Sequence, residues 1–300
     1  RDIRWRRSPG VSARRGTVTL DVLVAVPTPP PYSGPEMNGA QLLTSGLPGI
    51  VLHHVRTNAH DANAVKGRVT GASLGRLVGM WWRTVATMVT VRPRVFYIFL
   101  SQNLTGFLRD ALLIWTARAF GARVVIHLRG GNLRAFREQA PPWLQALVRR
   151  TLACASRACV EGVGLVSALT DVVPPARIDV VPNVIDFKPP PHAPRNDGAC
   201  TVLFMGHLSL AKGFGDWLSA APSVLAADSR VRLEVAGAWL LDERNIRTDH
   251  AARDLPAEAE QLSASSDGRL CLLGVVTDQA RLAAFARADV LVLPSYSEGL

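Results

Sequence analysis

The sequence has few cysteines, and none of them lie at metal-binding or redox spacing. Four cysteines occur in 300 residues, without a C-x-x-C pair, and three of them sit in apolar runs. This pattern excludes a disulfide scaffold and a zinc finger, and it favours reduced core thiols in a cytoplasmic protein. The four are Cys154, Cys159, Cys200 and Cys271.

The sequence also lacks an uninterrupted apolar run long enough to span a membrane. Its longest apolar neighbourhood, residues 74–91, contains Arg76 and Arg83, and such charges make a poor membrane span. The basic start of the chain is not followed by the apolar core of a signal peptide. The chain has no initiator Met and stops inside a predicted loop, so we expect a fragment of a cytoplasmic protein. Peripheral binding at the inner face of the membrane is compatible with this expectation.

Acidic residues are fewer than basic ones. Lys and Arg number 34 against 24 Asp and Glu, a net charge of +10. This balance favours an acidic partner, which could be nucleic acid, an anionic membrane surface or a phosphorylated substrate. Six arginines stand against Asp2 alone within residues 1–16. We interpret these residues as a disordered basic leader rather than a nucleic-acid arm, and expect no nucleic-acid partner.

With 48% hydrophobic residues, the chain has material for two cores. Short apolar runs alternate with segments of helical periodicity, which predicts an α/β protein of two Rossmann-like parallel-sheet domains. We expect the first domain at 17–187, a proline-rich linker at 188–197 and the second domain at 198–300. The predicted strands are 17–26, 49–55, 95–100, 123–129, 158–160, 177–181, 200–205, 231–236, 269–273 and 288–293. The predicted helices are 36–45, 73–91, 104–120, 141–153, 214–227 and 279–287, with one more within 241–266.

Residues 206–213 form a predicted strand-to-helix turn that carries Lys212. A turn of this kind directs free backbone amides and the positive end of the helix dipole toward the carboxyl end of the strand. An anion fits there. Residues 294–300 follow another predicted buried strand and place Glu298 at the same end of the sheet. A lysine that binds phosphate and a carboxylate that binds hydroxyls predict a nucleotide sugar as ligand.

Three series of residues occur in a fixed order along the chain. They are Val181-Pro182-Asn183-Val184-Ile185-Asp186, then Phe204-Met205-Gly206-His207-Leu208-Ser209 with Lys212-Gly213, then Ala288-Asp289-Val290-Leu291-Val292-Leu293-Pro294-Ser295 with Ser297-Glu298-Gly299. Together they resemble the retaining family 4 glycosyltransferases of the GT-B fold. The resemblance implies two domains facing a cleft, the first on the acceptor side and the second incomplete. It also implies sugar transfer from a nucleotide sugar to a glycan or lipid-linked acceptor, as in polysaccharide or glycolipid synthesis.

The same resemblance assigns roles to residues. In the first half, His127 at the end of a strand would contact the donor sugar near its reacting carbon, with Arg129 as the alternate. A structural imidazole is an equally good interpretation of His127. Gly34, in the proline-rich loop 27–39, would face the donor phosphates, although a plain connector explains this loop as well.

In the second half the resemblance places Gly206, His207 and Lys212 at the diphosphate. The donor-sugar hydroxyls would be bound by Glu298 together with Gly299 and Leu300. Val275 and Val276 would lie beside the nucleotide base, or would simply pack beneath the following helix. The family does not generally need a metal, and the sequence has no D-x-D motif, so neither a metal nor a cofactor is expected.

Two alternatives remain from the sequence. His207 stands where relatives usually carry arginine, and Arg129 stands where many carry histidine. With the early end of the chain, these departures favour a catalytically impaired fragment that binds nucleotide sugar or glycan. The G-x-S-x-G pattern around Ser73 formally matches the nucleophile turn of α/β-hydrolases, but that turn requires a preceding buried strand.

Overall fold

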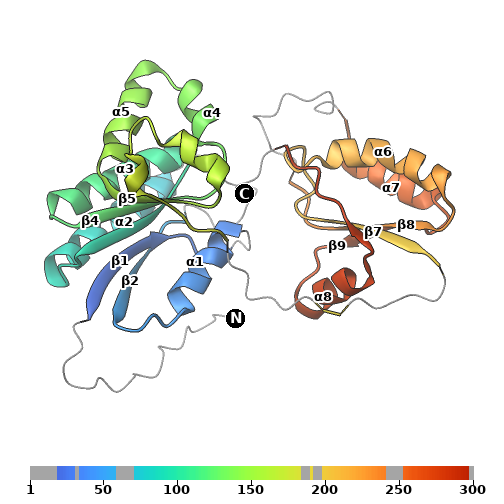
Figure 1. Ribbon diagram of the computed structural model, residues 1–300, viewed down its shortest axis with the longest axis horizontal. Coiled ribbons are helices and arrows are strands. Elements are labelled where there is room, and N and C mark those ends of the chain that lie inside the picture. Colours follow the sequence, from blue (N-terminus) through green and yellow to red (C-terminus); the bar gives the residue numbers. More distant parts are fainter. Residues whose placement is uncertain are drawn as a thin grey trace. The chain divides into compact units, whose positions relative to one another are not determined.

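The computed structural model describes residues 19–30, 34–58, 71–183, 190–191, 198–240 and 253–296. The chain divides into two compact units, drawn in Figure 1. The described residues up to 183 belong to the first unit, and those from 190 to 296 belong to the second. Most of the predicted linker and the whole basic leader lie outside the described residues, and each unit is treated by itself below.

The first unit is built on a six-stranded sheet whose strand pairs are all parallel. The strand order is β2-β1-β3-β4-β5-β6. The strands are β1 (Leu20–Val26), β2 (Ile50–Arg56), β3 (Val95–Leu100), β4 (Arg123–Leu128), β5 (Ala155–Val160) and β6 (Ile178–Val180). The connecting helices are α1 (Gly34–Thr44), α2 (Gly71–Thr90), α3 (Leu104–Ala119), α4 (Leu133–Glu138) and α5 (Pro142–Ala153), with the short 3-10 turns η2 (Val163–Ala168) and η3 (Pro175–Arg177).

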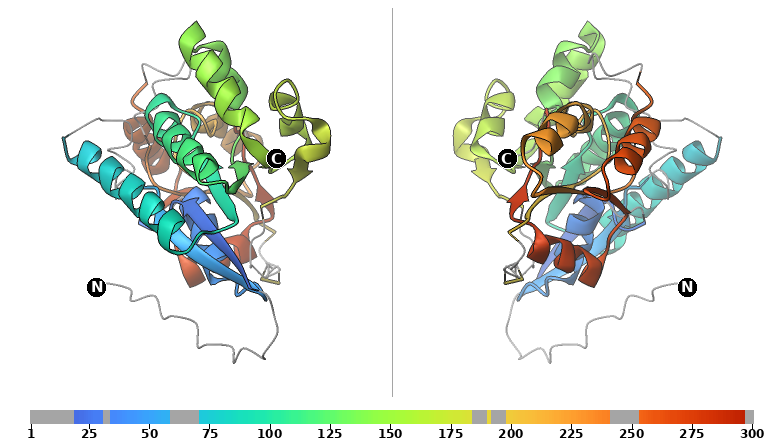
Figure 2. Two further views of the ribbon diagram at one scale, coloured as in Figure 1. Left: turned by 90° about the vertical axis from the view of Figure 1, so that its left-hand side faces the viewer. Right: turned by 90° about the vertical axis from the view of Figure 1, so that its right-hand side faces the viewer.

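Helices cover the two faces of this sheet unequally. Helices α2, α3 and α5 pack on one face, where Leu23, Ile98 and Ile126 belong to the main core. Figure 2 shows these three helices lying side by side in front of the strands. Helix α1 packs on the opposite face, against Val22 and Val24 of β1. Because successive strand residues point to opposite faces, β1 must be apolar at nearly every position, as its sequence is.

The second unit has a four-stranded parallel sheet of order β10-β7-β8-β9. Its strands are β7 (Cys200–Met205), β8 (Val231–Ala236), β9 (Leu270–Gly274) and β10 (Val290–Leu291), and its helices are α6 (Phe214–Ala227), α7 (Leu255–Ser265) and α8 (Asp278–Arg287). Helices α6 and α7 bury Phe214, Trp217 and Leu255 against one face of this sheet. Helix α8 packs on the other face through Ala284.

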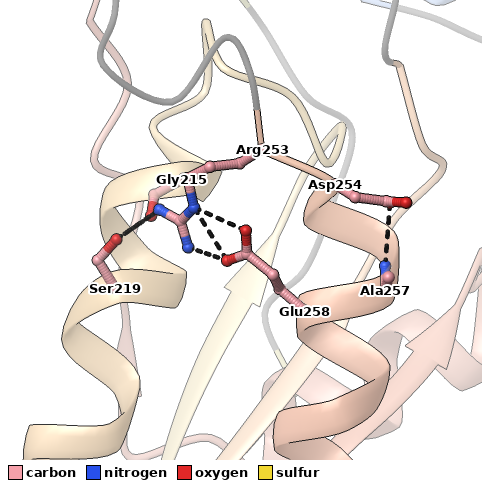
Figure 3. Close-up of polar contacts among 6 residues, drawn as sticks. All are labelled: Gly215, Ser219, Arg253, Asp254, Ala257 and Glu258. Carbon is pink, nitrogen blue, oxygen red and sulfur yellow. Dashed lines mark hydrogen bonds and ion pairs between the residues drawn. The ribbon is translucent and has the colours of Figure 1, made fainter.

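One arginine joins helices α6 and α7. Arg253 precedes α7 and forms an ion pair with Glu258 in its first turns, and it donates to the Gly215 carbonyl (3.2 Å) and the Ser219 hydroxyl (2.6 Å) of α6, as Figure 3 shows. Asp254 caps α7 by accepting from the Ala257 amide at 3.2 Å. These contacts fix the first turn of α6, which directly follows the predicted phosphate-binding turn.

Most predicted elements are present, with shifts of one or two residues at their ends. Four differences are larger. Strand β1 begins at Leu20 instead of residue 17, and residues 17 and 18 lie outside the described part of the chain. Helix α4 was not predicted, because its six residues are too short for a clear helical period. Strand β5 begins three residues before its prediction, at Ala155, since Arg157 interrupts the apolar run. Strand β10 retains only two residues of the predicted 288–293, although the backbone amides of Asp289 and Val292 on either side of it still donate to β7 carbonyls.

Candidate functional site

The second unit has a reversal of strand order between β7 and β10. From β7 the chain proceeds outward to β8 and β9, then returns to place β10 on the other side of β7. In open parallel sheets, ligands bind at such a point, beyond the carboxyl ends of the strands. The loops that follow β7 and β10 are residues 206–213 and 294–300, the two segments singled out in the sequence. The topology therefore brings the described parts of both segments to one crevice position.

Gly213 shows how closely these loops approach each other. It precedes α6 with φ of +67°, a conformation that favours glycine. A Cβ atom at this position would lie 2.0 Å from the Pro294 carbonyl oxygen. Glycine is thus required at position 213 for two reasons: its φ is positive, and the second loop passes directly over it.

Tyr296 joins the two loops by hydrogen bonds. Its amide donates to the Ala211 carbonyl at 3.1 Å, and its hydroxyl donates to the Asp216 carboxylate at 2.6 Å. Asp216 lies in the first turn of α6. Tyr296 stands two residues before Glu298. Glu298, Gly299 and Leu300, the predicted sugar-binding residues, lie outside the described part of the chain.

The predicted phosphate-binding residues occupy the loop itself. Gly206 follows β7, and its amide donates to Ala236 of β8 at 3.0 Å. His207 and Lys212 are half-buried. Apart from its chain neighbours, no atom in the described ranges lies within 4 Å of a Cβ built on Gly206, so this glycine leaves open space on the loop.

Two serines flank this turn that the sequence analysis did not single out. Ser209 is buried, and its hydroxyl has no hydrogen-bond partner among the described residues; the same holds for the Ser295 hydroxyl. A buried hydroxyl without a partner is costly in a finished fold. The sequence offered a weak signal, because each serine stands within a proposed phosphate- or sugar-binding loop, as hydroxyls that bind oxyanions often do.

Val275 and Val276 follow β9 at the same edge of the sheet. The Gly237 amide donates to the Gly274 carbonyl at 2.8 Å, which fixes the end of β9 beside β8. Val276 packs with Leu203 and Ala284 in the core beneath α8, so the packing interpretation accounts for it. The side chain of Val275 is 69% exposed, so it is available to a ligand at the carboxyl end of β9.

In the first unit, the candidate residue His127 lies near the carboxyl end of β4. Only 2% of its surface is exposed, and the rings of Tyr97 and Phe99 stand edge-on to it at centroid distances of 5.9 and 5.5 Å. Burial, with a smaller contribution from the charge of Arg129, lowers the pKa of His127 to about 4. The imidazole is therefore neutral at physiological pH.

Tyr97 determines which nitrogen of His127 carries the proton. Its hydroxyl is hydrogen-bonded to Nδ1 of the imidazole. Burial raises the pKa of Tyr97, so the hydroxyl keeps its proton, and within the described chain Nδ1 is the acceptor available to it. Nδ1 then accepts and Nε2 carries the hydrogen. This Nε2 has no partner among the described residues. The site therefore holds a neutral N–H group that can donate a hydrogen bond to a ligand oxygen.

The guanidinium of Arg129 is occupied by contacts with neighbouring side chains. Its Nε lies 3.1 Å from Glu161 Oε1 at the end of β5, and the guanidinium stands 4.8 Å from the centre of the Phe99 ring. It also donates to the Asn183 side chain. Glu161 in turn accepts from the Gly130 amide at 2.9 Å. This pairing ties the ends of β4 and β5 together, which favours His127 over Arg129 as the residue that contacts substrate.

The remaining first-unit candidate, Gly34, begins α1, and apart from its chain neighbours no atom of the described residues lies within 4 Å of a Cβ built on it. The close approach falls instead on Gly39, where a Cβ would lie 2.0 Å from the Pro27 carbonyl. Gln102, which the sequence analysis did not single out, donates to the carbonyls of Arg129 and Gly130 (2.7 and 3.0 Å). Its Oε1 has no partner in the described chain.

An arginine-lined hollow of about 800 Å³ lies beyond the ends of β4 and β5. Helices α4 and α5 and turn η2 form its walls, which do not include His127. Arg137 pairs with Asp171 through two nitrogens, and Arg149 lies 3.6 Å from the same carboxylate. With Arg134 as the third guanidinium, positive charge exceeds negative charge around this hollow.

Two further sequence-based possibilities concern other chemistry. Gly71, Ser73 and Gly75 all lie within helix α2, so the pattern does not form the strand-to-helix turn of a hydrolase nucleophile. Across the described ranges, no three His, Cys, Asp or Glu residues cluster closely enough to hold a metal ion.

Comparison with known proteins gives a match in fold but not in sequence. No family model matches the sequence, and no curated protein matches it. The catalytic domain of starch synthase IV from Arabidopsis thaliana, bound to ADP and acarbose, superimposes with a TM-score of 0.60 at 10% identity, over 93% of this chain and 78% of that one.

Two other solved structures are similar in the same way. The lipopolysaccharide outer core galactosyltransferase WaaB gives a TM-score of 0.55 at 11% identity, over 92% of this chain and 74% of its own. TarM gives 0.52 at 11% identity, over 73% of this chain, which spans only 41% of TarM. The two parallel-sheet units therefore have the fold of the GT-B glycosyltransferases.

Proposed function

We propose that this chain is a glycosyltransferase that uses a nucleotide-sugar donor. Two findings support the proposal: the GT-B fold, which solved glycosyltransferases share, and the position of the Lys212 loop at the reversal of strand order in the second unit. We further propose that the chain is a retaining enzyme of family 4, on the residue series of the sequence analysis.

The diphosphate of the donor would lie on the turn between β7 and α6. The amino end of α6 offers the positive end of the helix dipole, although the Gly213 and Phe214 amides already donate to the Leu210 and Ser209 carbonyls. Gly206 leaves space for close approach. Lys212 supplies a cation, and His207 and the unpartnered hydroxyl of Ser209 supply further polar groups. Because negative charge grows on the diphosphate as the sugar departs, fixed donors at this position stabilise the transition state.

The reaction breaks the bond between the anomeric carbon and the diphosphate oxygen, whose electron pair leaves with the diphosphate. A new bond forms from an acceptor hydroxyl oxygen to the same face of that carbon, and the hydroxyl proton passes to the departing phosphate oxygen. No protein nucleophile, metal or cofactor is required in this sequence of events. Glu298, with the amides of Gly299 and Leu300, would bind the sugar hydroxyls, and Val275 would border the base.

His127 would donate a hydrogen bond from Nε2 to an oxygen of the donor sugar. A neutral donor suits this role because it stabilises developing charge without binding the free diphosphate as a cation would. The hydrogen bond from Tyr97 keeps the proton on Nε2. A glycan or lipid-linked acceptor bearing an acidic group would fit the arginine-lined hollow beyond β4 and β5.

The observation that carries the proposal is the pair of Tyr296 hydrogen bonds, which hold the segment before Glu298 against the Lys212 loop. The test is calorimetric titration of the 300-residue chain with UDP and with ADP. We expect saturable binding that Lys212→Ala weakens tenfold or more, a loss of about 1.4 kcal/mol or greater.

Arg230→Ala is the matched control. It also removes one positive charge from the second unit, but Arg230 precedes β8 and so lies at the amino edge of the same sheet. If both variants weakened nucleotide binding equally, the loss would reflect only the net charge of the second unit, which would contradict the proposal. The absence of any nucleotide binding would contradict it as well.

A second candidate function is binding of nucleotide sugar without transfer. The observation that favours it is His207, since an imidazole cannot form the two parallel hydrogen bonds that arginine makes to phosphate. Incubation with a panel of nucleotide sugars separates the two candidates. Release of nucleoside diphosphate that Lys212→Ala abolishes supports transfer, and tight donor binding without release supports the binding function.

A further inference from the structure

The outward side of helix α2 is apolar and exposed. Leu74, Val78, Trp82 and Val89 are 63%, 56%, 65% and 53% exposed. Their spacing of four, four and seven residues places them on one side of the helix, whereas Met80 and Met88 on another side enter the core. A tryptophan and three aliphatic side chains aligned in water are not needed for folding.

Helix α3 continues this apolar surface. Its exposed residues Leu104, Leu108, Leu112 and Trp115 repeat at intervals of four, four and three. The helix packs beside α2, where Trp81 donates to the Thr116 hydroxyl at 3.1 Å. Figure 2 shows the two helices side by side on the same face of the sheet. We call these eight residues, four from each helix, the α2–α3 apolar surface; its size distinguishes it from scattered exposed apolar residues.

The two helices that carry this surface, and the neighbouring α5, expose basic side chains and no acidic ones within their described residues. Helices α2 and α5 contain no Asp or Glu, and Asp110, the acidic residue of α3, is fully buried and paired with Arg109 at 2.6 Å. The exposed arginines of the three helices are Arg76, Arg83, Arg118, Arg149 and Arg150. A protein partner would have to supply most of the carboxylates itself, whereas an anionic surface of any kind complements this charge.

One end of the surface has a hollow that combines both features. Val89 and the half-exposed ring of Phe120 border a space of about 410 Å³ together with Arg92 and Arg94. Neither guanidinium forms an ion pair with another residue of the described chain. Apolar walls next to two cations match the chemistry of a lipid, in which a phosphate group adjoins an acyl chain.

We infer that the α2–α3 apolar surface binds the surface of an anionic phospholipid bilayer. Trp82 and Trp115 lie at the boundary of headgroups and acyl chains, where indole rings are favoured, and the arginines contact lipid phosphates. Within the described chain no helix is long and apolar enough to cross a membrane, so these helices lie along the surface. If the proposed glycosyl transfer also holds, the acceptor of the sugar is lipid-linked.

The test uses the 300-residue chain, with no sugar donor present, in co-sedimentation with lipid vesicles. We expect binding to phosphatidylcholine vesicles that contain phosphatidylglycerol, weak binding to pure phosphatidylcholine, and loss of binding at high salt. Val78→Glu combined with Trp82→Glu should reduce binding tenfold or more. Both side chains are exposed, so the variant should keep the circular dichroism spectrum of the unmodified chain.

Two further variants make the test specific. Arg92→Gln with Arg94→Gln should weaken binding to the anionic vesicles by about 25-fold, since each arginine near a charged surface contributes about fivefold, and should leave binding to neutral vesicles unchanged. Val163→Glu removes a side chain that is 77% exposed on η2, away from the surface, and should bind as the unmodified chain does.

Three results would overturn the inference. The first is no binding to either vesicle. The second is equal binding by the Val78/Trp82 variant and the unmodified chain. The third is a dimer in solution, seen by light scattering without lipid, that the same variant dissociates, because the surface would then be a protein interface. Since no donor is used, failure here is distinct from failure of the proposed glycosyl transfer.

Discussion

Replacing Gly213 by alanine tests the geometry on which the candidate site depends. The residue has φ of +67°, and the added methyl group would stand 2.0 Å from the Pro294 carbonyl oxygen. That oxygen is backbone and cannot rotate away. The segment 294–296 must therefore move off the Lys212 loop, or the loop must distort.

The cost of this change has two parts. An alanine in the left-handed conformation costs about 1–2 kcal/mol. Displacing the second loop also weakens the hydrogen bond from the Tyr296 amide to Ala211, worth about 1 kcal/mol, and the bond to the Asp216 carboxylate, worth about 1.5–3 kcal/mol before allowance for solvent exposure. We expect the second unit to lose about 2–4 kcal/mol of stability.

Hydrogen exchange measured on peptides is the suitable assay, because it reports the second unit separately from the first. Peptides from β7 and α6 should exchange faster in Gly213→Ala, and nucleotide binding should weaken at the same time. Gly206→Ala is the stability control, since it lies in the same loop with open space around its Cβ. Equal exchange in the two alanine variants would refute the close approach of the loops.

Three further outcomes follow from the described contacts. The pKa of His127 is about 4 in the folded chain and about 6.5 in an unfolded chain, so the unfolded chain binds the proton first as pH falls. The free energy of unfolding should therefore drop by up to about 3 kcal/mol between pH 6.5 and 4. In urea unfolding, His127→Gln should lack this part of the pH dependence. Tyr97→Phe removes the partner of Nδ1 and frees the tautomer, so kcat should fall about tenfold with little change in KM; an unchanged kcat would leave Tyr97 a packing residue. Arg253→Ala should destabilise the second unit by about 1–2 kcal/mol, because a partly exposed ion pair with Glu258 and bonds to α6 are lost, and exchange of α6 amides checks this; an effect no larger than that of Arg230→Ala would contradict it.

Local sequence patterns predicted most of the fold because its elements are locally encoded. Strands buried on both faces are apolar at nearly every position, as in β1 and β7, and the helices between them carry a 3.6-residue period. The patterns failed where a tertiary contact overrides them. Residue 157 interrupts the apolar run of β5 with an arginine that pairs with Asp179 of the neighbouring β6. Asp289, directly before β10, accepts with its carboxylate from the Thr201 amide of a strand 88 residues earlier.

The candidate site was predicted in part. The strand, turn and helix around Gly206 and Lys212 were predicted because they stand next to each other in the sequence. The unpartnered buried atoms of Ser209, Ser295 and Gln102 were not, because such an atom is visible only when its neighbours among the described residues are placed. The apolar period of α2 can be counted in the sequence, but the same period fits a buried helix, so exposure of this surface could not be predicted.

The sequence by itself determined the succession of strands and helices, the positive charge and the two loops that carry the candidate residues. These depend on periodicity and residue type within a few positions of each other. Only the tertiary structure decided that β10 lies on the side of β7 opposite to β8 and that Tyr296 rests on the Lys212 loop. It also decided that Arg129 pairs with Glu161, while Nε2 of His127 has no partner within the described part of the chain. The physical reason is that these contacts join residues 32 to 88 positions apart, whose pairing depends on the packing of the whole sheet.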